Sequence, residues 1–87
     1  MEPKRVVITG LGMVTALGND VPTTWQNLVA GRSGAGPITH FDASQFKTHF
    51  ACEVKDLDTT AVLDPKEARK NDRYAQLAAV AADEAMR

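Results

Sequence analysis

Three side chains in the middle of the chain are of the types that carry nucleophilic or metal chemistry. Cys52 is the single cysteine, and His40 and His49 lie nine residues apart. A reactive thiolate needs a neighbouring cation, a helix N-terminus or a paired histidine, and the residues around Cys52 supply none of these. The histidines have no third ligand at a metal spacing. We interpret Cys52 as a small packing residue of a strand and the histidines as surface or loop-anchoring residues, and we predict no catalytic or metal site.

A glycine-punctuated segment near the N-terminus is similar to the phosphate-binding loop of dinucleotide-binding proteins. Gly10 and Gly12 follow an apolar run and precede a predicted helix, as that fingerprint requires. The third glycine position holds Thr15, and Arg32 with a glycine-proline loop stands where an acidic residue is expected, about 20 residues further on. We therefore favour a role for these glycines in turning the backbone. A dinucleotide-binding half-domain is kept as the weaker alternative.

A basic cluster is the third candidate. Lys66, Arg69 and Lys70 are spaced i, i+3 and i+4, so one turn of a helix would gather them on one side. The ordinary interpretation is a solvated charged face. Two observations favour a docking surface instead: cations just after a helix start oppose the helix dipole, and Arg73 continues the basic run. On the residues alone, both interpretations stay open.

The first half of the chain shows patterns typical of one strand and one helix. The β-branched apolar run Arg5–Thr9 predicts a strand buried on both faces of a parallel sheet. A helix is predicted from Pro22, which suits the first turn, to about Ala30, with Gly31 as its stop. The spacing of the apolar residues predicts a buried stripe of Trp25, Leu28 and Val29.

The second half predicts a loop, a strand and two helices. Residues 31–45 are rich in glycine, serine and proline and predict a long ordered loop, and the alternation in residues 50–55 predicts a half-exposed strand. Asp64 as N-cap, Pro65 at N1 and Glu67 at N3 predict a helix start. The last helix is predicted to pack one face closely on another helix or a sheet, through Tyr74, Leu77, Ala78, Ala81, Ala82 and Ala85.

The composition is that of an ordinary soluble protein. The 87 residues include 10 basic and 11 acidic side chains, for a formal net charge of −1, which gives no indication of nucleic acid or an anionic membrane as a partner. A single cysteine forms no internal disulfide, which is consistent with a reducing compartment. The short apolar run after the charged start, Met1–Arg5, is too short for a signal sequence or a membrane span. We therefore predict a cytoplasmic protein.

The end of the chain favours an incomplete domain. Asp83 and Glu84 fall in the final turn of the last helix, where the helix dipole disfavours anions, and no glycine or proline follows. Two strands and two main helices are also too few to cover a two-faced strand and an alanine-rich face. We expect residues 1–87 to be part of an α/β domain whose remaining sheet lies outside this sequence.

Several motifs occur in a consistent order along the chain. They are Arg5–Gly18, Thr24–Trp25, Leu28–Gly31, Ser33–Gly34, His40–Asp42, Phe50–Ala51 and Lys66–Asp72. Together they resemble the opening of the elongating β-ketoacyl-acyl-carrier-protein synthases of the synthase II type, over nearly the whole chain. Ala16 stands where many members carry proline, and Asn71, which affects only local packing, stands where methionine is common.

This resemblance implies a fold and an activity. The fold is thiolase-like, with two related α/β halves layered α/β/α/β/α, and the enzyme is a homodimer. In the family an acyl group moves from the carrier protein to an active-site cysteine, malonyl-carrier protein loses carbon dioxide, and the carbanion attacks the thioester while two histidines stabilise the oxyanion. That cysteine and both histidines lie beyond residue 87 in the family, so the segment is expected to be inactive alone, and no cofactor is expected.

The resemblance also implies a partner for the basic cluster. Lys66, Arg69 and Lys70 match the patch with which elongating members dock the acidic helix of acyl carrier protein. The segment would then supply scaffold and a docking surface. A non-catalytic subunit similar to a chain-length factor would share this opening and lack the nucleophile, so it stays the main alternative.

Overall fold

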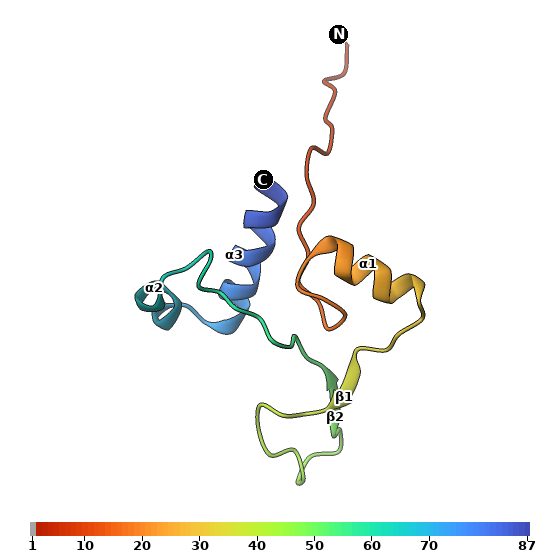
Figure 1. Ribbon diagram of the computed structural model, residues 1–87, viewed down its shortest axis with the longest axis vertical. Helices are drawn as coiled ribbons and strands as arrows, with labels where there is room; N and C mark the ends of the chain where they lie inside the picture. The colour runs from red at the N-terminus through yellow and green to blue at the C-terminus, as the bar shows by residue number, and fades with distance from the viewer. Residues whose placement is uncertain (1) are drawn as a thin grey trace.

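The computed structural model describes residues 2–87, so Met1 at the charged start of the chain lies outside the described residues. Its elements follow the order α1, β1, β2, α2 and α3 (Figure 1). Their bounds are Val21–Val29 for α1, Ala35–Pro37 for β1, Phe50–Cys52 for β2, Pro65–Lys70 for α2 and Arg73–Met86 for α3. The chain therefore combines helices and strands, as predicted, but its first regular element is a helix.

Helix α1 begins and ends where the sequence predicts. Asp20 is its N-cap, and the carboxylate accepts a hydrogen bond from the Thr23 amide at 2.7 Å. Hydrogen bonding from Thr23 also lowers the pKa of Asp20 from its ordinary value. Pro22 lies in the first turn. At the other end Gly31 adopts a φ of +74° and donates to the Leu28 carbonyl at 3.1 Å, which confirms glycine as the stop.

Strands β1 and β2 form an antiparallel hairpin. Ala35 pairs with Cys52, Gly36 with Ala51 and Pro37 with Phe50. Strand β2 confirms a strand at the start of the predicted range, but it covers only residues 50–52. Its burial is the reverse of the predicted alternation, because Phe50 and Cys52 are exposed and Ala51 between them is half-buried. Strand β1, in contrast, lies inside the segment predicted as a loop. Its Ala-Gly-Pro sequence has no strand pattern of its own, so the pairing with β2 decides its conformation.

The predicted strand at Arg5–Thr9 is not formed in the described structure. Figure 1 shows this segment as an extended chain that leaves the rest of the molecule. Val6, Val7 and Ile8 are 92%, 67% and 82% exposed. A strand needs hydrogen bonds to a neighbour, and within residues 2–87 no strand lies beside this segment. The prediction of a strand buried on both faces is therefore wrong for this structure.

Residues 2–87 build almost no hydrophobic core. Ala43 and Thr24 are the buried residues among them, at 8% and 6% exposed. The predicted stripe of α1 is wrong as well, because Trp25, Leu28 and Val29 are 63%, 56% and 68% exposed. The radius of gyration is 16.4 Å, whereas a compact domain of this length has about 12 Å. The apolar face of α1 therefore has no covering element in the described chain.

The N-terminal glycines lie against the backbone of α3. A Cβ atom placed on Gly10 would overlap the carbonyl oxygen of Ala85, and a Cβ atom on Gly12 would overlap that of Ala81. Only a residue without a side chain allows this approach. The alanine-rich face of α3 is thus closely approached at these two positions, but by a segment that is neither the helix nor the sheet that the sequence predicts.

The rest of the predicted face of α3 is covered unevenly. Leu77 is half-buried, together with Ala81 and Ala85. The other three members of the face, Tyr74, Ala78 and Ala82, are exposed. The glycine segment is narrow, so it covers one side of the helix and leaves the neighbouring side open.

Candidate docking surface

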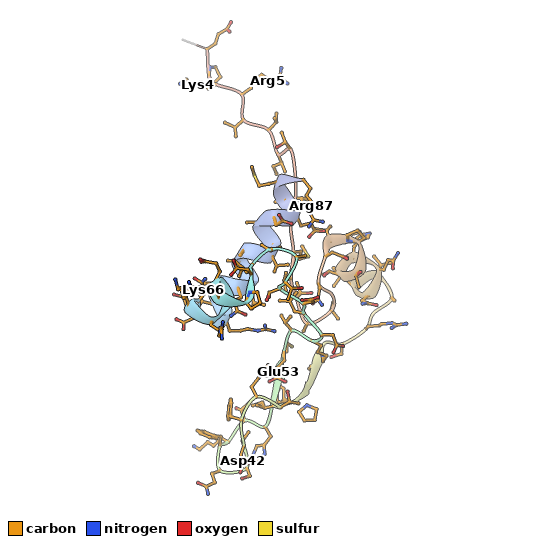
Figure 2. All side chains as sticks on the ribbon, turned by 60° about the vertical axis from the view of Figure 1, so that its left-hand side comes forward. Lys4, Arg5, Asp42, Glu53, Lys66 and Arg87 are labelled. Carbon is orange, nitrogen blue, oxygen red and sulfur yellow. The ribbon has the colours of Figure 1, made fainter. Side chains whose placement is uncertain are left out.

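The three predicted docking residues lie together on α2. Lys66, Arg69 and Lys70 are all exposed, and within residues 2–87 none of them forms an ion pair. The Arg69 Nε atom donates to the carbonyl of Pro65 at 3.2 Å, which holds the start of its side chain along the helix. Figure 2 shows Lys66 at the outer edge of the molecule. We call Lys66, Arg69 and Lys70 the basic surface.

The helix dipole of α2 favours two of the three cations of the basic surface. Helix α2 has six residues, so Arg69 and Lys70 lie in its last turn. The helix dipole favours cations there. The prediction that these cations oppose the helix dipole is therefore wrong for Arg69 and Lys70, and the dipole gives no support for a docking role. Their exposure and lack of an acidic partner within the described chain do not depend on it.

The start of α2 is held by the residues that the sequence predicts. The Asp64 carboxylate accepts from the Glu67 amide at 2.7 Å, and Pro65 lies in the first turn. This confirms the predicted helix start. It also shows that Asp64, the acidic side chain just before the basic surface, is already engaged by the backbone.

The end of α2 is tied to α3 by side-chain amides. Asn71 Nδ2 donates to the Glu67 carbonyl at 2.7 Å. Gln76 Nε2, from the first turns of α3, donates to the carbonyls of Ala68 at 2.7 Å and Asn71 at 3.1 Å. The last carbonyls of a helix lack donors within the helix, and these amides supply them. The orientation of α2 relative to α3 is thereby constrained at the corner between them.

Glu84 connects α3 to the glycine segment and to α1. Its Oε1 atom accepts from the Met13 amide at 2.9 Å, and its Oε2 atom accepts from the Val21 amide at 2.9 Å. Val21 is the first residue of α1, where a helix dipole favours an anion. The acidic residue that is unfavourable in the last turn of α3 is thus placed at the favourable end of another helix.

The same contacts argue against the dinucleotide-binding alternative. A phosphate at the N-terminus of α1 would need free backbone amides there. The amides of Val21 and Thr23 already donate to Glu84 and Asp20. In addition, no strand precedes Gly10 in the described residues, so the strand-turn-helix context of that fingerprint is not present.

The second part of the glycine segment is a tight turn attached to α1. Thr15 N donates to the Gly18 carbonyl at 2.8 Å, and Gly18 N donates to the Thr15 carbonyl at 3.3 Å. The buried hydroxyl of Thr24 donates to the Gly18 carbonyl at 3.3 Å and lies 3.1 Å from that of Thr15. Asn27 Nδ2 donates to the Leu17 carbonyl at 2.5 Å. These contacts agree with the interpretation that the segment turns the backbone.

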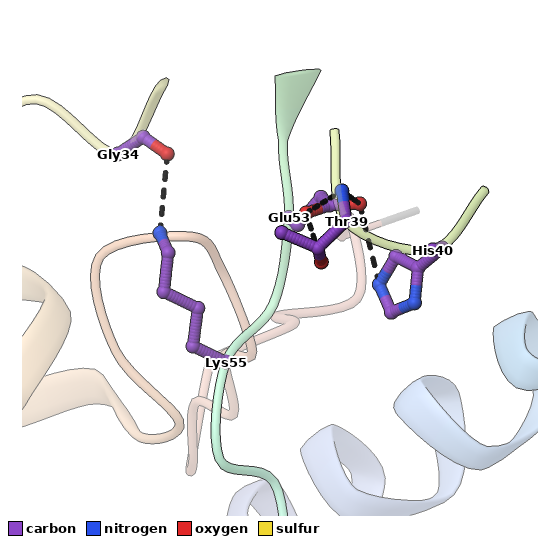
Figure 3. Close-up of polar contacts among 5 residues, drawn as sticks. All are labelled: Gly34, Thr39, His40, Glu53 and Lys55. Atoms are coloured by element: carbon purple, nitrogen blue, oxygen red, sulfur yellow. Dashed lines mark hydrogen bonds and ion pairs between the residues drawn. The ribbon is translucent and has the colours of Figure 1, made fainter. Parts of the chain in front are cut away.

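His40 anchors the loop that follows β1, as the sequence predicts. Glu53 accepts from Thr39 N at 3.2 Å and from Thr39 Oγ1 at 2.9 Å, and His40 Nε2 lies 3.5 Å from the same carboxylate (Figure 3). Burial raises the pKa of Glu53, but the hydrogen bonds from Thr39 and the charge of His40 outweigh this effect, so the net pKa is lowered. Beside this group Lys55 Nζ donates to the Gly34 carbonyl at 3.3 Å.

The other two candidates from the sequence lie on the surface. Cys52 is a free, exposed thiol on β2, so its interpretation as a packing residue is wrong for this structure. Its strand pairs with β1 at the backbone, but within residues 2–87 no element covers its side chain. His49 is exposed, as predicted, and its carbonyl accepts from Ile38 N at 3.1 Å. Among residues 2–87 no group of histidine, cysteine and acidic side chains is placed to hold a metal ion.

Comparison with known proteins assigns these features to a family. The family described as "Beta-ketoacyl synthase, N-terminal domain" matches residues 3–87. The 3-oxoacyl-[acyl-carrier-protein] synthase 2 of Coxiella burnetii is 55% identical over 85 residues, which is 98% of this chain and 20% of that protein. The protein of the same name from Synechocystis is 50% identical over 86 residues, or 99% of this chain and 21% of that protein.

A third relative, the 3-oxoacyl-[acyl-carrier-protein] synthase 2 of Staphylococcus aureus, is 46% identical over 86 residues, again 99% of this chain and 21% of that protein. The chain thus spans about a fifth of the length of these relatives.

No helix in residues 2–87 has the length and apolar character needed to cross a membrane.

Proposed function

Since the chain belongs to the β-ketoacyl synthase family through its N-terminal domain, we propose that it is the N-terminal segment of a longer condensing enzyme of fatty acid synthesis. The observation that carries this proposal is the identity of 55% over 98% of the chain to a 3-oxoacyl-[acyl-carrier-protein] synthase 2. The reaction is the decarboxylative condensation of malonyl-acyl-carrier protein with an enzyme-bound acyl group. The nucleophilic cysteine and two histidines belong to the part outside this segment.

The exposed apolar residues support a longer protein with a thiolase-like layered fold. Val6, Val7 and Ile8 lie on an extended segment without a neighbouring strand in the described chain, and Trp25 and Leu28 form a largely exposed face of α1. Burying a large apolar side chain stabilises a fold by about 1.5 to 3 kcal/mol. In the proposed enzyme, further strands and helices cover these residues, and two such chains form a homodimer.

We further propose that the basic surface docks the acidic helix of acyl carrier protein. Its support is the exposure of Lys66, Arg69 and Lys70 and the lack of ion-pair partners within residues 2–87. Complementary charge raises the encounter rate with an acidic partner and sets its register. The segment thereby contributes scaffold and partner recognition, and the chemistry takes place elsewhere in the enzyme.

The first test is an assay of the proposed full-length enzyme with acyl-carrier and malonyl-carrier substrates. We expect carbon dioxide release coupled to formation of a 3-oxoacyl product. A purified full-length protein that releases neither would instead be a non-catalytic partner subunit, similar to a chain-length factor.

The second test reverses charge on the basic surface. In the full-length enzyme, the double substitution Lys66→Glu and Arg69→Glu should raise the KM for carrier-bound substrate about tenfold at low salt and leave kcat unchanged. The effect should shrink at high salt, because the lost attraction is between exposed charges. Arg32→Glu, at an exposed arginine after α1, makes the same kind of charge change away from α2 and serves as the control. An unchanged KM at low salt would exclude the basic surface as the docking site.

A further inference from the structure

We infer that Gln76 is the positioning residue that presents the basic surface to acyl carrier protein. This inference rests on the proposed function. Gln76 lies on α3 and is half-buried, and its amide nitrogen donates to the carbonyls of Ala68 and Asn71 at 2.7 and 3.1 Å. One side chain therefore holds the last turn of α2 and the residue that follows it.

Helix α2 depends on such support because of its length. It has six residues, and isolated helices shorter than about 12 residues are marginal in water. Asp64 satisfies an amide at the start, but the carbonyls at the end need donors from outside the helix. Asn71 reaches one of them from the adjacent position in the chain. Gln76 supplies a donor from a different helix, and among residues 2–87 it is the side chain of α3 that donates to the backbone of α2.

The contact of Gln76 bears directly on the basic surface. Ala68 lies between Lys66 and Arg69 on the same turn, so its carbonyl is part of the backbone that carries the cations. Helix α3 is longer, with 14 residues, and Glu84 ties it to α1 and to the glycine segment. Through Gln76 the short basic helix is thus held on the better-supported part of the chain.

Loss of this contact should affect carrier binding more than the chemical step. If α2 frays, the three cations must be ordered again when the carrier docks, and this ordering weakens binding. In the full-length enzyme, Gln76→Ala should raise the KM for carrier-bound substrate about fivefold, with kcat unchanged. Gln76→Glu should act at least as strongly, because a carboxylate cannot donate to the two carbonyls. The KM for a small acyl thioester without a carrier protein should stay as in the unchanged enzyme.

Gln26→Ala is the matched control. Gln26 is an exposed glutamine on α1, and within residues 2–87 its side chain makes no hydrogen bond, so its removal should leave both KM values unchanged. A further measurement combines Gln76→Ala with Lys66→Glu and Arg69→Glu. If Gln76 acts through the cations, its effect should be smaller once they are reversed. The rise in KM of the combined variant should then be smaller than the product of the two separate fold-changes.

The outcomes separate this inference from the proposed function. If charge reversal raises the KM for carrier-bound substrate and Gln76→Ala does not, Gln76 has no positioning role and the docking proposal stands. An equal rise for carrier-bound and small substrates would show a general structural defect and would also overturn the inference. If charge reversal has no effect, both proposals fail. A selective rise that is reduced in the charge-reversed enzyme supports both.

Discussion

Substitution of Gly12 by alanine should lower the free energy of unfolding of the proposed full-length enzyme by about 3 kcal/mol. The added Cβ atom would overlap the backbone carbonyl of Ala81, so the glycine segment and α3 would have to move apart. A flexible side chain could turn away from such an overlap, but a helix carbonyl cannot. Urea denaturation of the two proteins measures the difference directly.

Gly36→Ala is the control for this substitution. Nothing lies within 4 Å of a Cβ atom at Gly36, so this change should alter the free energy of unfolding by less than about 0.5 kcal/mol. Both substitutions reduce the flexibility of the unfolded chain in the same way. The difference between the two variants therefore reports the close approach to α3. Equal stability of the two variants would contradict this contact.

The second large effect is expected for Glu84→Gln, with a loss of about 2 kcal/mol in the free energy of unfolding. The Glu84 carboxylate accepts from the amides of Met13 and Val21, one on each oxygen. Glutamine has a single side-chain oxygen, so one of the two backbone amides would face an NH2 group. We expect faster hydrogen exchange at Met13 and Val21 as well, since their amides lose this protection.

Asp83→Asn provides the neighbouring control. Asp83 pairs with Arg87 at 2.5 Å, at a spacing of i, i+4 on an exposed side of α3. Pairs of this kind contribute about 0.3 to 0.5 kcal/mol. If Asp83→Asn and Glu84→Gln cost the same, the contribution of Glu84 comes from general charge and not from its contacts with the two amides.

The proposed longer enzyme accounts for the small buried fraction of the described chain. The chain covers about a fifth of the length of the relatives named as synthases, and small segments bury a smaller fraction of their surface than whole domains do. The exposed residues of the N-terminal segment and of α1 are of the type found in protein interiors. In the proposed enzyme, the structural role of the segment thus depends on elements that it does not contain.

Helix boundaries were predictable because their determinants lie within a few residues. Pro22 in the first turn and Gly31 after the last mark the ends of α1 as expected, and Asp64 begins α2 through a contact with an amide three residues away. The spacing of Lys66, Arg69 and Lys70 was sufficient to place them on one helix turn. The short length of α2 was not predicted, because its end depends on Asn71 and Gln76 as well as on its own sequence.

Burial was the quantity that the sequence could not determine. The apolar pattern of Val6, Val7 and Ile8 shows that these residues suit an interior, but an interior requires a second surface. The same holds for Trp25 and Leu28 on α1. Periodicity identifies which face of an element is apolar, and only the tertiary structure decides whether another element covers that face.

By itself, the sequence determined the family resemblance, the local caps and turns, and the basic residues that share a helix turn, since each depends on neighbours in the chain. Only the tertiary structure decided that Glu84 joins α3 to Met13 and Val21, more than 60 positions earlier in the chain. The same is true of the contact of Gly12 with Ala81 and of the hydrogen bond from Gln76 to the end of α2. Polar side chains and glycines have many possible partners, and the contact that forms depends on which distant backbone the fold brings within hydrogen-bond or van der Waals range.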